Sequence, residues 1–197
     1  MSSIEYNNLK DEELIKFVHS EDRKAFNELA IRYSDKLLNF INGYVHDYAL
    51  AQNLKQDTLM KVWTHSNSYR EIAKFSTWVF TIAGNLAKTE LRKIKRRNTF
   101  SFSQLSSQDN EFNLERVAGE DNYSLSNDHH TFMSIREAIS ELTEEFRNII
   151  ILKDIQELSY EEISRILDLP LGTVKSRINR ARLKLKEIIK QDRRNDI

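Results

Sequence analysis

The order of hydrophobic and polar residues predicts helices in two separate stretches of the chain. Apolar residues recur three or four positions apart from about residue 11 to residue 97, and again from about residue 132 to residue 190. This is the period of an amphipathic helix, and neither stretch shows the alternation of a half-buried strand. In the first stretch, a set of apolar residues fits the interior of a helical bundle: Phe17, Phe26, Leu29, Tyr33, Leu37 and Phe40.

A segment without this period separates the two stretches. Residues 98 to 131 are rich in Ser, Asn and Asp, a composition typical of a flexible connection. The sequence therefore predicts an all-α fold, in which two small helical domains at residues 1–97 and 133–197 are joined by a flexible linker at residues 98–132.

Composition removes several other classes of protein. Only 4 Gly and 1 Pro in 197 residues argue against a sandwich or barrel, and the absence of Cys excludes a disulfide scaffold and thiolate metal sites. No apolar run approaches the ~18 residues of a membrane span, and the first residues do not resemble a signal peptide. We therefore expect a cytoplasmic protein. Because no nucleophile–base pair, metal-ligand spacing or phosphate loop stands out, we also expect that it is not an enzyme. It should need no cofactor or metal and should not insert into a membrane.

Charge is sorted into blocks although the net charge is 0. Residues 88–97 hold six basic residues and one acid, a sum of +5, and residues 172–194 hold nine basic residues and two acids, a sum of +7. Residues 98–131 between them hold six acids and one Arg, a sum of −5. Two positive patches on separate helical domains favour a nucleic-acid partner over the alternative of two solvated helix faces.

The second basic block belongs to a predicted helix-turn-helix. Ser159 and Glu162 form a capping box that starts one helix, residues 168–172 interrupt the chain, and a basic helix follows over residues 174–188. The second helix of this motif enters the major groove, where Arg suits guanine and Asn suits adenine. We expect Ser176, Asn179 and Arg180 to face base edges, Lys175, Arg177 and Arg182 to anchor phosphates, and Thr173 to cap the helix.

The first basic block ends another candidate DNA-binding helix. When residues 78–97 are projected as a helix, apolar residues gather on one side, and cations interleaved with short polar residues gather on the other. Aromatic residues beside cations just upstream suit unpaired bases, although Trp63 and Trp78 are expected in the core. The candidate DNA contacts are Tyr69, Arg70, Lys74, Phe75, Ser76, Asn85, Lys88, Thr89, Arg92 and Arg96.

Two parts of the chain resemble bacterial RNA polymerase sigma factors of the extracytoplasmic-function (ECF) subfamily. AQNLKQDTLMKVW at residues 51–63 and NSYREIAKFSTWVFTIAGNLAKTELRKIKRR at residues 67–97 are similar to region 2, and GTVKSRINRARLKL at residues 172–185 is similar to region 4. The resemblance implies a subunit that binds core RNA polymerase and promoter DNA, is a monomer when free, and is controlled by an anti-sigma factor. The first domain would read and open the −10 element, and the second would read the −35 element.

The resemblance also implies where core polymerase binds. Residues 51–63 correspond to the helix that docks on the polymerase clamp. The chain departs from the family pattern at Gln52 and Asn53, where acids are usual, at Leu59, where Phe is usual, and at Gly84, where Arg is common. The implied core-polymerase contacts are Asn53, Gln56, Asp57 and Met60.

The linker length predicts weak promoter binding by the free chain. About 34 residues can span ~110 Å when fully extended but average only ~30 Å as a free coil, whereas two promoter elements two helical turns apart lie ~70 Å from each other. The alternatives are a homodimeric helix-turn-helix regulator that never joins the polymerase and a helical interaction protein without a DNA role. The resemblance to region 2 argues against both.

Overall fold

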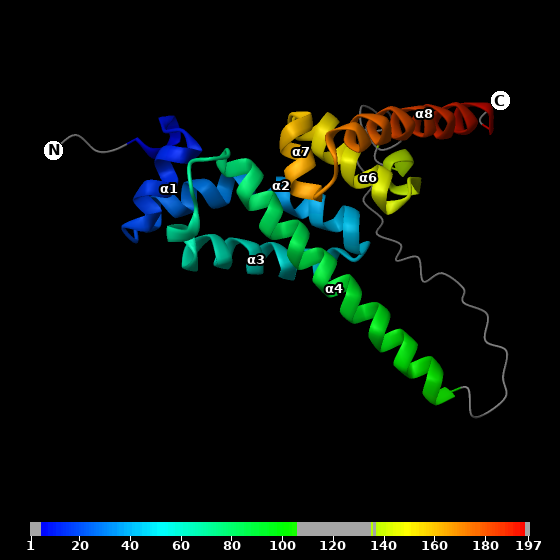
Figure 1. The fold of residues 1–197 in the computed structure, drawn as a ribbon, viewed down its shortest axis with the longest axis horizontal. Coiled ribbons are helices and arrows are strands. Elements are labelled where there is room, and N and C mark those ends of the chain that lie inside the picture. The colour runs from blue at the N-terminus through cyan, green and yellow to red at the C-terminus, as the bar shows by residue number, and fades with distance from the viewer. Residues whose placement is uncertain (1–4, 106–134, 136, 196–197) are drawn as a thin grey trace.

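The computed structural model describes residues 5–105, 135 and 137–195, and all regular elements among these residues are helical. Four helices form the N-terminal bundle (Figure 1): α1 (Asp11–His19), α2 (Arg23–Val45), α3 (Tyr48–Thr64) and α4 (Phe75–Leu105). Two short 3₁₀ turns accompany them, η1 (Tyr6–Asn8) and η2 (Ser66–Ser68). This part of the structure confirms the predicted all-helical first domain.

Carboxylates cap the starts of α2 and α3. Asp22 accepts hydrogen bonds from the N–H groups of Lys24 and Ala25 at the start of α2, and Asp47 accepts one from the N–H of Leu50 at the start of α3. Each cap satisfies backbone donors that have no partner inside the helix. The turn from α1 into α2 and the turn from α2 into α3 therefore each lead into a capped helix.

The interior of the bundle matches the predicted core positions. Leu29, Tyr33, Leu37 and Phe40 are buried, and the rings of Phe40 and Phe80 meet edge to face at 5.2 Å. A Cβ atom on Gly84 would lie 3.7 Å from the Phe40 ring, so Gly84 faces the core rather than solvent. Phe17 and Phe26 are only partly buried but pack against the same cluster.

The C-terminal domain contains the predicted helix-turn-helix. Helix α6 (Glu144–Ile150) continues into a π-helical turn, η3 (Ile151–Ile155), and is followed by α7 (Tyr160–Leu167) and α8 (Leu171–Asn195). The capping box at the start of α7 is confirmed: the Ser159 hydroxyl accepts from the Glu162 N–H at 3.2 Å, and the Glu162 carboxylate accepts from the Ser159 N–H at 2.7 Å.

The break between α7 and α8 is shorter than predicted. Asp168 ends α7 in the left-handed conformation at φ 56°, and α8 begins at Leu171 directly after Pro170. The Val174 N–H already donates to the Pro170 carbonyl at 3.0 Å. Thr173 therefore lies inside α8, and the prediction that it caps this helix is wrong, because the proline's fixed φ allows the helix to begin earlier.

The two helical domains pack against each other. Helix α7 lies on α4, α6 and η3 lie on α2, and buried residues from both domains form one hydrophobic cluster. Beyond this body, α4 extends away from the other helices (Figure 1) and runs to Leu105, past the predicted domain boundary at Arg97. Residues 106–132 of the predicted linker lie outside the described residues. No helix in the described ranges is long and apolar enough to cross a membrane.

Candidate nucleic-acid and polymerase interfaces

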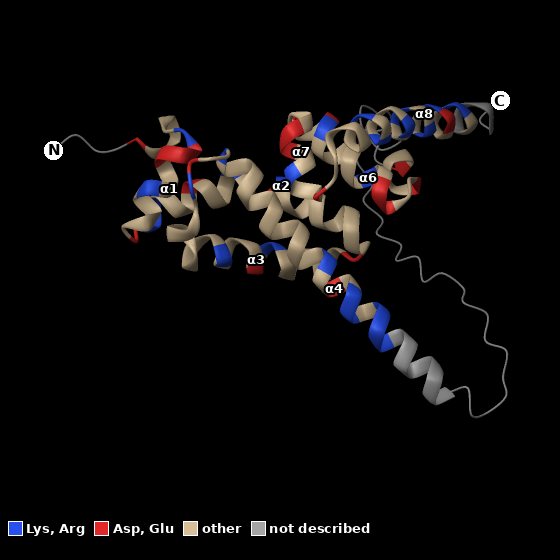
Figure 2. Cartoon of the chain, in the orientation of Figure 1, with Lys and Arg blue, Asp and Glu red and all other residues tan. Residues whose placement is uncertain are grey.

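One long face of α4 is polar, cationic and accessible. Val79, Ala83 and Ala87 on the inner face are fully buried, while the opposite face follows helical spacing away from the bundle. Figure 2 shows Lys and Arg lining the part of α4 that leaves the bundle. This outer face carries the predicted contacts Asn85, Thr89, Arg92 and Arg96, all exposed, and Lys88, which is half-buried.

The loop before α4 is closed by aromatic packing. Tyr69 is only 5% exposed, its ring lies 5.5 Å from the Trp78 ring, and its hydroxyl donates to the Ala73 carbonyl at 2.8 Å. Burial is the main cause that raises the pKa of Tyr69, to about 12. Phe75 is 1% exposed, and its backbone N–H donates to the Glu12 carboxylate at 3.0 Å.

Two of the predicted DNA contacts are buried in this structure. Tyr69 and Phe75 belong to the core, because their rings pack on each other at 6.0 Å, so neither ring is exposed where the sequence led us to expect it. Arg70 and Lys74 stay exposed, and Ser76 is half-buried. The Arg70 guanidinium donates to the Asn67 carbonyl at 3.0 Å, which holds it over the loop.

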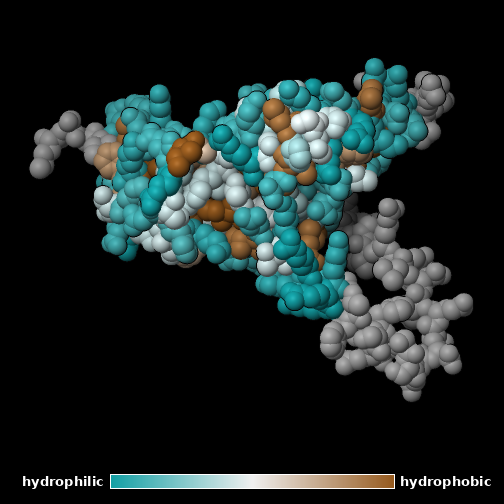
Figure 3. All heavy atoms as spheres, viewed as in Figure 1, coloured by the Kyte–Doolittle hydropathy of each residue, from teal (hydrophilic) through white to brown (hydrophobic). Residues whose placement is uncertain are grey.

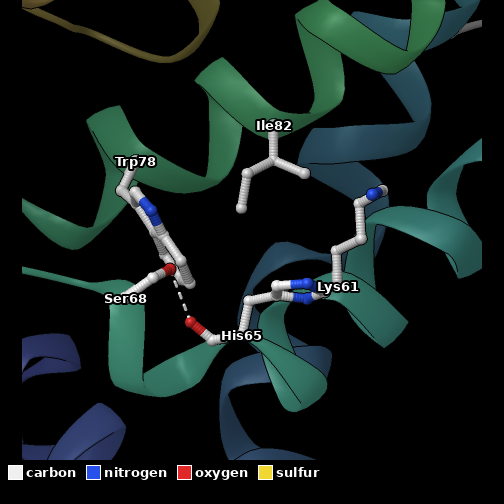
Figure 4. Close-up of a pocket in the computed structure, with 5 residues that line it drawn as sticks. All are labelled: Lys61, His65, Ser68, Trp78 and Ile82. Carbon is white, nitrogen blue, oxygen red and sulfur yellow. Dashed lines mark hydrogen bonds between the residues drawn. The ribbon is translucent and has the colours of Figure 1, made fainter.

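An open hollow of about 200 Å³ lies beside this loop (Figure 4). Trp78 and Ile82 of α4 line one side, and Lys61 and His65 at the end of α3 line the other, together with Ser68 of η2. The Ser68 hydroxyl donates to the His65 carbonyl at 2.7 Å, which fixes the turn at the edge of the hollow.

Sequence reasoning missed this hollow. Trp78 was expected in the core, but it is only half-buried and presents a surface to the hollow. The other lining residues carried no signal of their own. The hollow combines a flat aromatic wall, an aliphatic wall, a hydroxyl and a cation. This chemistry suits a planar, hydrogen-bonding ring on a negatively charged strand.

Helix α8 presents the predicted base-reading face to solvent. Val174, Ile178 and Ala181 are fully buried against the rest of the domain. The Arg180 guanidinium is exposed and donates only weakly to Ser176 one turn earlier, at 3.3 and 3.4 Å. The exposed outer face consists of Lys175, Ser176, Asn179 and Arg180.

Two of the predicted phosphate anchors already have acidic neighbours. Arg177 lies 3.4 Å from the Glu145 carboxylate of α6, and Arg182 forms an ion pair with Asp154 of η3. The hydrogen bond to Asp154 raises the pKa of Arg182, and its charge adds to the effect. Both arginines therefore also tie α8 to the preceding helices.

The outer face of α3 carries the expected polymerase contacts. Asn53, Gln56, Asp57 and Met60 are all exposed and recur three or four residues apart, so they share one side of the helix. Met60, a large apolar side chain on this face, is 61% exposed. On the side of the molecule seen in Figure 3, the surface is largely hydrophilic with scattered apolar patches.

Family models match both helical domains. The model described as Sigma-70 region 2 matches residues 29–97, and the model described as Sigma-70 region 4 matches residues 132–185. RNA polymerase sigma-H factor from Pseudomonas aeruginosa is 31% identical over 178 residues, covering 88% of this chain and 90% of that protein. ECF RNA polymerase sigma-E factor from Escherichia coli strain K12 is 34% identical over 177 residues, covering 88% and 91%.

Solved structures share the fold. The sigma factor RpoE, solved with the anti-sigma factor NepR from Bartonella quintana, is 26% identical and aligns with a TM-score of 0.60, covering 85% of this chain and 98% of that one. CnrH, solved with the cytosolic domain of CnrY, is 21% identical with a TM-score of 0.62, covering 92% and 98%, which supports the fold alone.

The fold and the matches to the family models together define a protein that contains regions 2 and 4 of the sigma-70 class, in that order. Such proteins are initiation factors without enzymatic activity that direct RNA polymerase to promoters. The chain belongs to the ECF family of RNA polymerase sigma factors. This membership confirms the predicted family and argues against the two alternatives, the homodimeric regulator and the interaction protein without a DNA role.

Proposed function

We propose that the outer face of α4 and the neighbouring hollow bind the −10 element as an opened strand. The exposed cations Arg92 and Arg96 follow the phosphates, and Asn85 and Thr89 between them offer hydrogen bonds to base edges. A base that leaves the duplex loses its stacking partners, at a cost of a few kcal/mol. The hollow beside Trp78 supplies a new partner and offsets part of that cost.

Helix α8 reads the −35 element in the major groove of intact duplex. Its buried stripe fixes the helix on α6 and α7, so the opposite face projects from the domain. Asn179 and Arg180 carry the side chains best suited to base edges, and Lys175 is placed for a phosphate. Arg177 and Arg182 can exchange their carboxylate partners for phosphates when DNA is present.

Core RNA polymerase binds the outer face of α3. Met60 gives this face an apolar centre, and Asn53, Gln56 and Asp57 give it a polar surrounding, the usual composition of a protein interface. The chain acts in the cytoplasm as a monomer until it joins the polymerase. An anti-sigma factor is a further partner, because the structurally similar sigma factor RpoE was solved in complex with the anti-sigma factor NepR.

The observation that carries this proposal is the placement of two exposed cationic faces on separate helical domains. Transcription in vitro with purified core polymerase and base-substituted promoters tests it. Substitutions in the −10 and −35 elements should each reduce initiation, and α4 and α8 variants should each respond to only one element. If variants of both helices respond to the same element, the assignment is wrong.

A further inference from the structure

The loop beside the hollow, at residues 69–74, is held by a helix from the beginning of the chain. In α1, the Glu12 carboxylate accepts a hydrogen bond at 3.0 Å from the backbone N–H of Phe75, the first residue of α4. These two residues are 63 positions apart in the chain. One turn further along α1, the Lys16 ammonium lies 3.0 Å from the Glu71 carboxylate of the loop. Two side chains of α1 therefore reach the segment that leads into α4.

The Glu12 carboxylate acts as a cap for α4. The first N–H groups of a helix have no partner inside that helix. Lys74, the residue before Phe75, has no acceptor in its side chain and cannot cap the helix itself. The Glu12 carboxylate takes this role, and its negative charge is favoured at the positive end of the helix. The start of α4 is thus capped by a different helix.

Helix α1 is fixed on α2, so Glu12 has a defined position. The Asp11 carboxylate accepts from the Tyr33 hydroxyl at 2.6 Å and from the Arg32 guanidinium at 2.8 Å. The same guanidinium donates to the carbonyls of residues 7 and 9, just before α1, at 2.8 Å each. The apolar side of α1 is buried in the bundle. The cap therefore comes from a rigid support.

The cap lies next to the aromatic wall of the hollow. Trp78, which forms that wall (Figure 4), belongs to the first turn of α4. The Phe75 ring is 1% exposed and lies 5.2 Å from the Tyr33 ring, so this turn stays attached to the bundle even without the cap. The Phe75 N–H would then need water as its partner, and the loop would have to move to admit it. Loss of the Glu12 carboxylate should therefore disturb the hollow without unfolding the domain.

On the basis of the proposed function, we propose that Glu12 is a positioning residue for the opening of the −10 element. It acts through α4 rather than on DNA. By capping this helix, it holds the loop and Trp78 in the arrangement that receives an unstacked base. A site that is already in its binding arrangement does not have to be ordered when the base arrives, so less of the binding free energy is lost.

The test compares initiation on two templates, with holoenzyme made from the full-length chain and core polymerase. One template is the duplex promoter, and the other has mismatches in the −10 element, so that its strands are already apart. Loss of a helix cap shifts an equilibrium about fivefold, and Glu12→Ala should reduce initiation on the duplex by about that factor. Extruding a base costs least where it is mismatched, so the same shift should not limit initiation on the second template.

Glu13→Ala is the matched control. The Glu13 carboxylate caps α1 itself, by accepting from the Lys10 N–H at 2.8 Å. Its loss removes a hydrogen bond of the same kind from the same helix but leaves the start of α4 capped, so the ratio of the two activities should equal that of the wild type. Glu12→Gln keeps an oxygen acceptor and should restore most of the activity on the duplex.

Two results would overturn the inference. An equal loss by Glu12→Ala on both templates would mark Glu12 as a residue needed only for folding, and wild-type activity of this variant on the duplex would show that the cap is not needed. Trp78→Ala on the same templates separates this inference from the proposed function. Normal activity of Trp78→Ala would contradict the role of the hollow itself, whereas a loss in Trp78→Ala with none in Glu12→Ala would contradict only the role of Glu12.

Discussion

Arg180→Ala tests whether α8 reads bases or only binds phosphates. Arg180 is exposed, and its hydrogen bonds reach only Ser176 in the same helix, at 3.3 and 3.4 Å. A surface substitution of this kind changes folding stability by less than ~0.5 kcal/mol, so any loss of DNA binding reflects the lost contact. A bidentate Arg–guanine pair contributes about 1–3 kcal/mol of discrimination, which is about 5- to 150-fold.

The assay is competition for holoenzyme among promoters in which each base pair of the −35 element is replaced in turn. Arg180→Ala should lose about 5- to 150-fold of the preference at one base pair and keep the preferences at the others. Lys184→Ala is the matched control, because Lys184 is exposed on the same helix and pairs with Glu187 at 3.4 Å. An equal loss on every promoter would refute base reading and mark Arg180 as a phosphate contact.

Three further predictions concern the outer face of α4 and the contact between the two helical domains. Trp78→Ala removes the aromatic wall of the hollow and should reduce the permanganate reactivity of thymines in the −10 element of holoenzyme complexes. If the variant keeps the reactivity of the wild type, no base needs the hollow. Arg92→Ala should reduce the steepness of the plot of log affinity against log salt concentration by about 0.7 for single-stranded −10 DNA, and Lys24→Ala is the control. An unchanged slope in the Arg92 variant would exclude a phosphate contact. Acidification should weaken the contact between Arg147 of α6 and His46 at the end of α2, because burial and the charge of Arg147 lower the pKa of His46. As the pH falls below about 6.5, a His46 side chain released from this contact takes up a proton that the packed side chain resists, so the packing of the two domains loses stability. A distance between spin labels on the two domains that shortens in acid would contradict this.

Periodicity predicted the helices well because each one carries its own apolar stripe. The stripe of α8 and the capping box of α7 are local features, and both appear as expected. Tyr69 shows where local reasoning ends. Its neighbours in sequence are polar, but α1 brings Glu12 to the start of α4, and the rings of Phe75 and Trp78 close over Tyr69. Burial created by distant segments leaves no signal in a short sequence window.

The contact between the two helical domains left no signal in the sequence for the same reason. Arg147 contacts residues that are 101 and 104 positions away in the chain, and nothing near Arg147 indicates that it crosses to another domain. The acidic partners of Arg177 and Arg182 likewise come from other elements. In contrast, the outer faces of α3 and α4 follow helical spacing, and the residues expected on them are exposed or half-buried in the structure.

Run-off transcription with purified core RNA polymerase is the most direct test of the central claim that this chain selects promoters for that enzyme. The chain, mixed with core polymerase and genomic DNA fragments, should co-elute with the polymerase and produce discrete transcripts whose start sites share two upstream elements. Core polymerase alone should produce none of these transcripts. If the chain fails to co-elute, or if the transcripts are the same with and without it on every fragment, the account is contradicted.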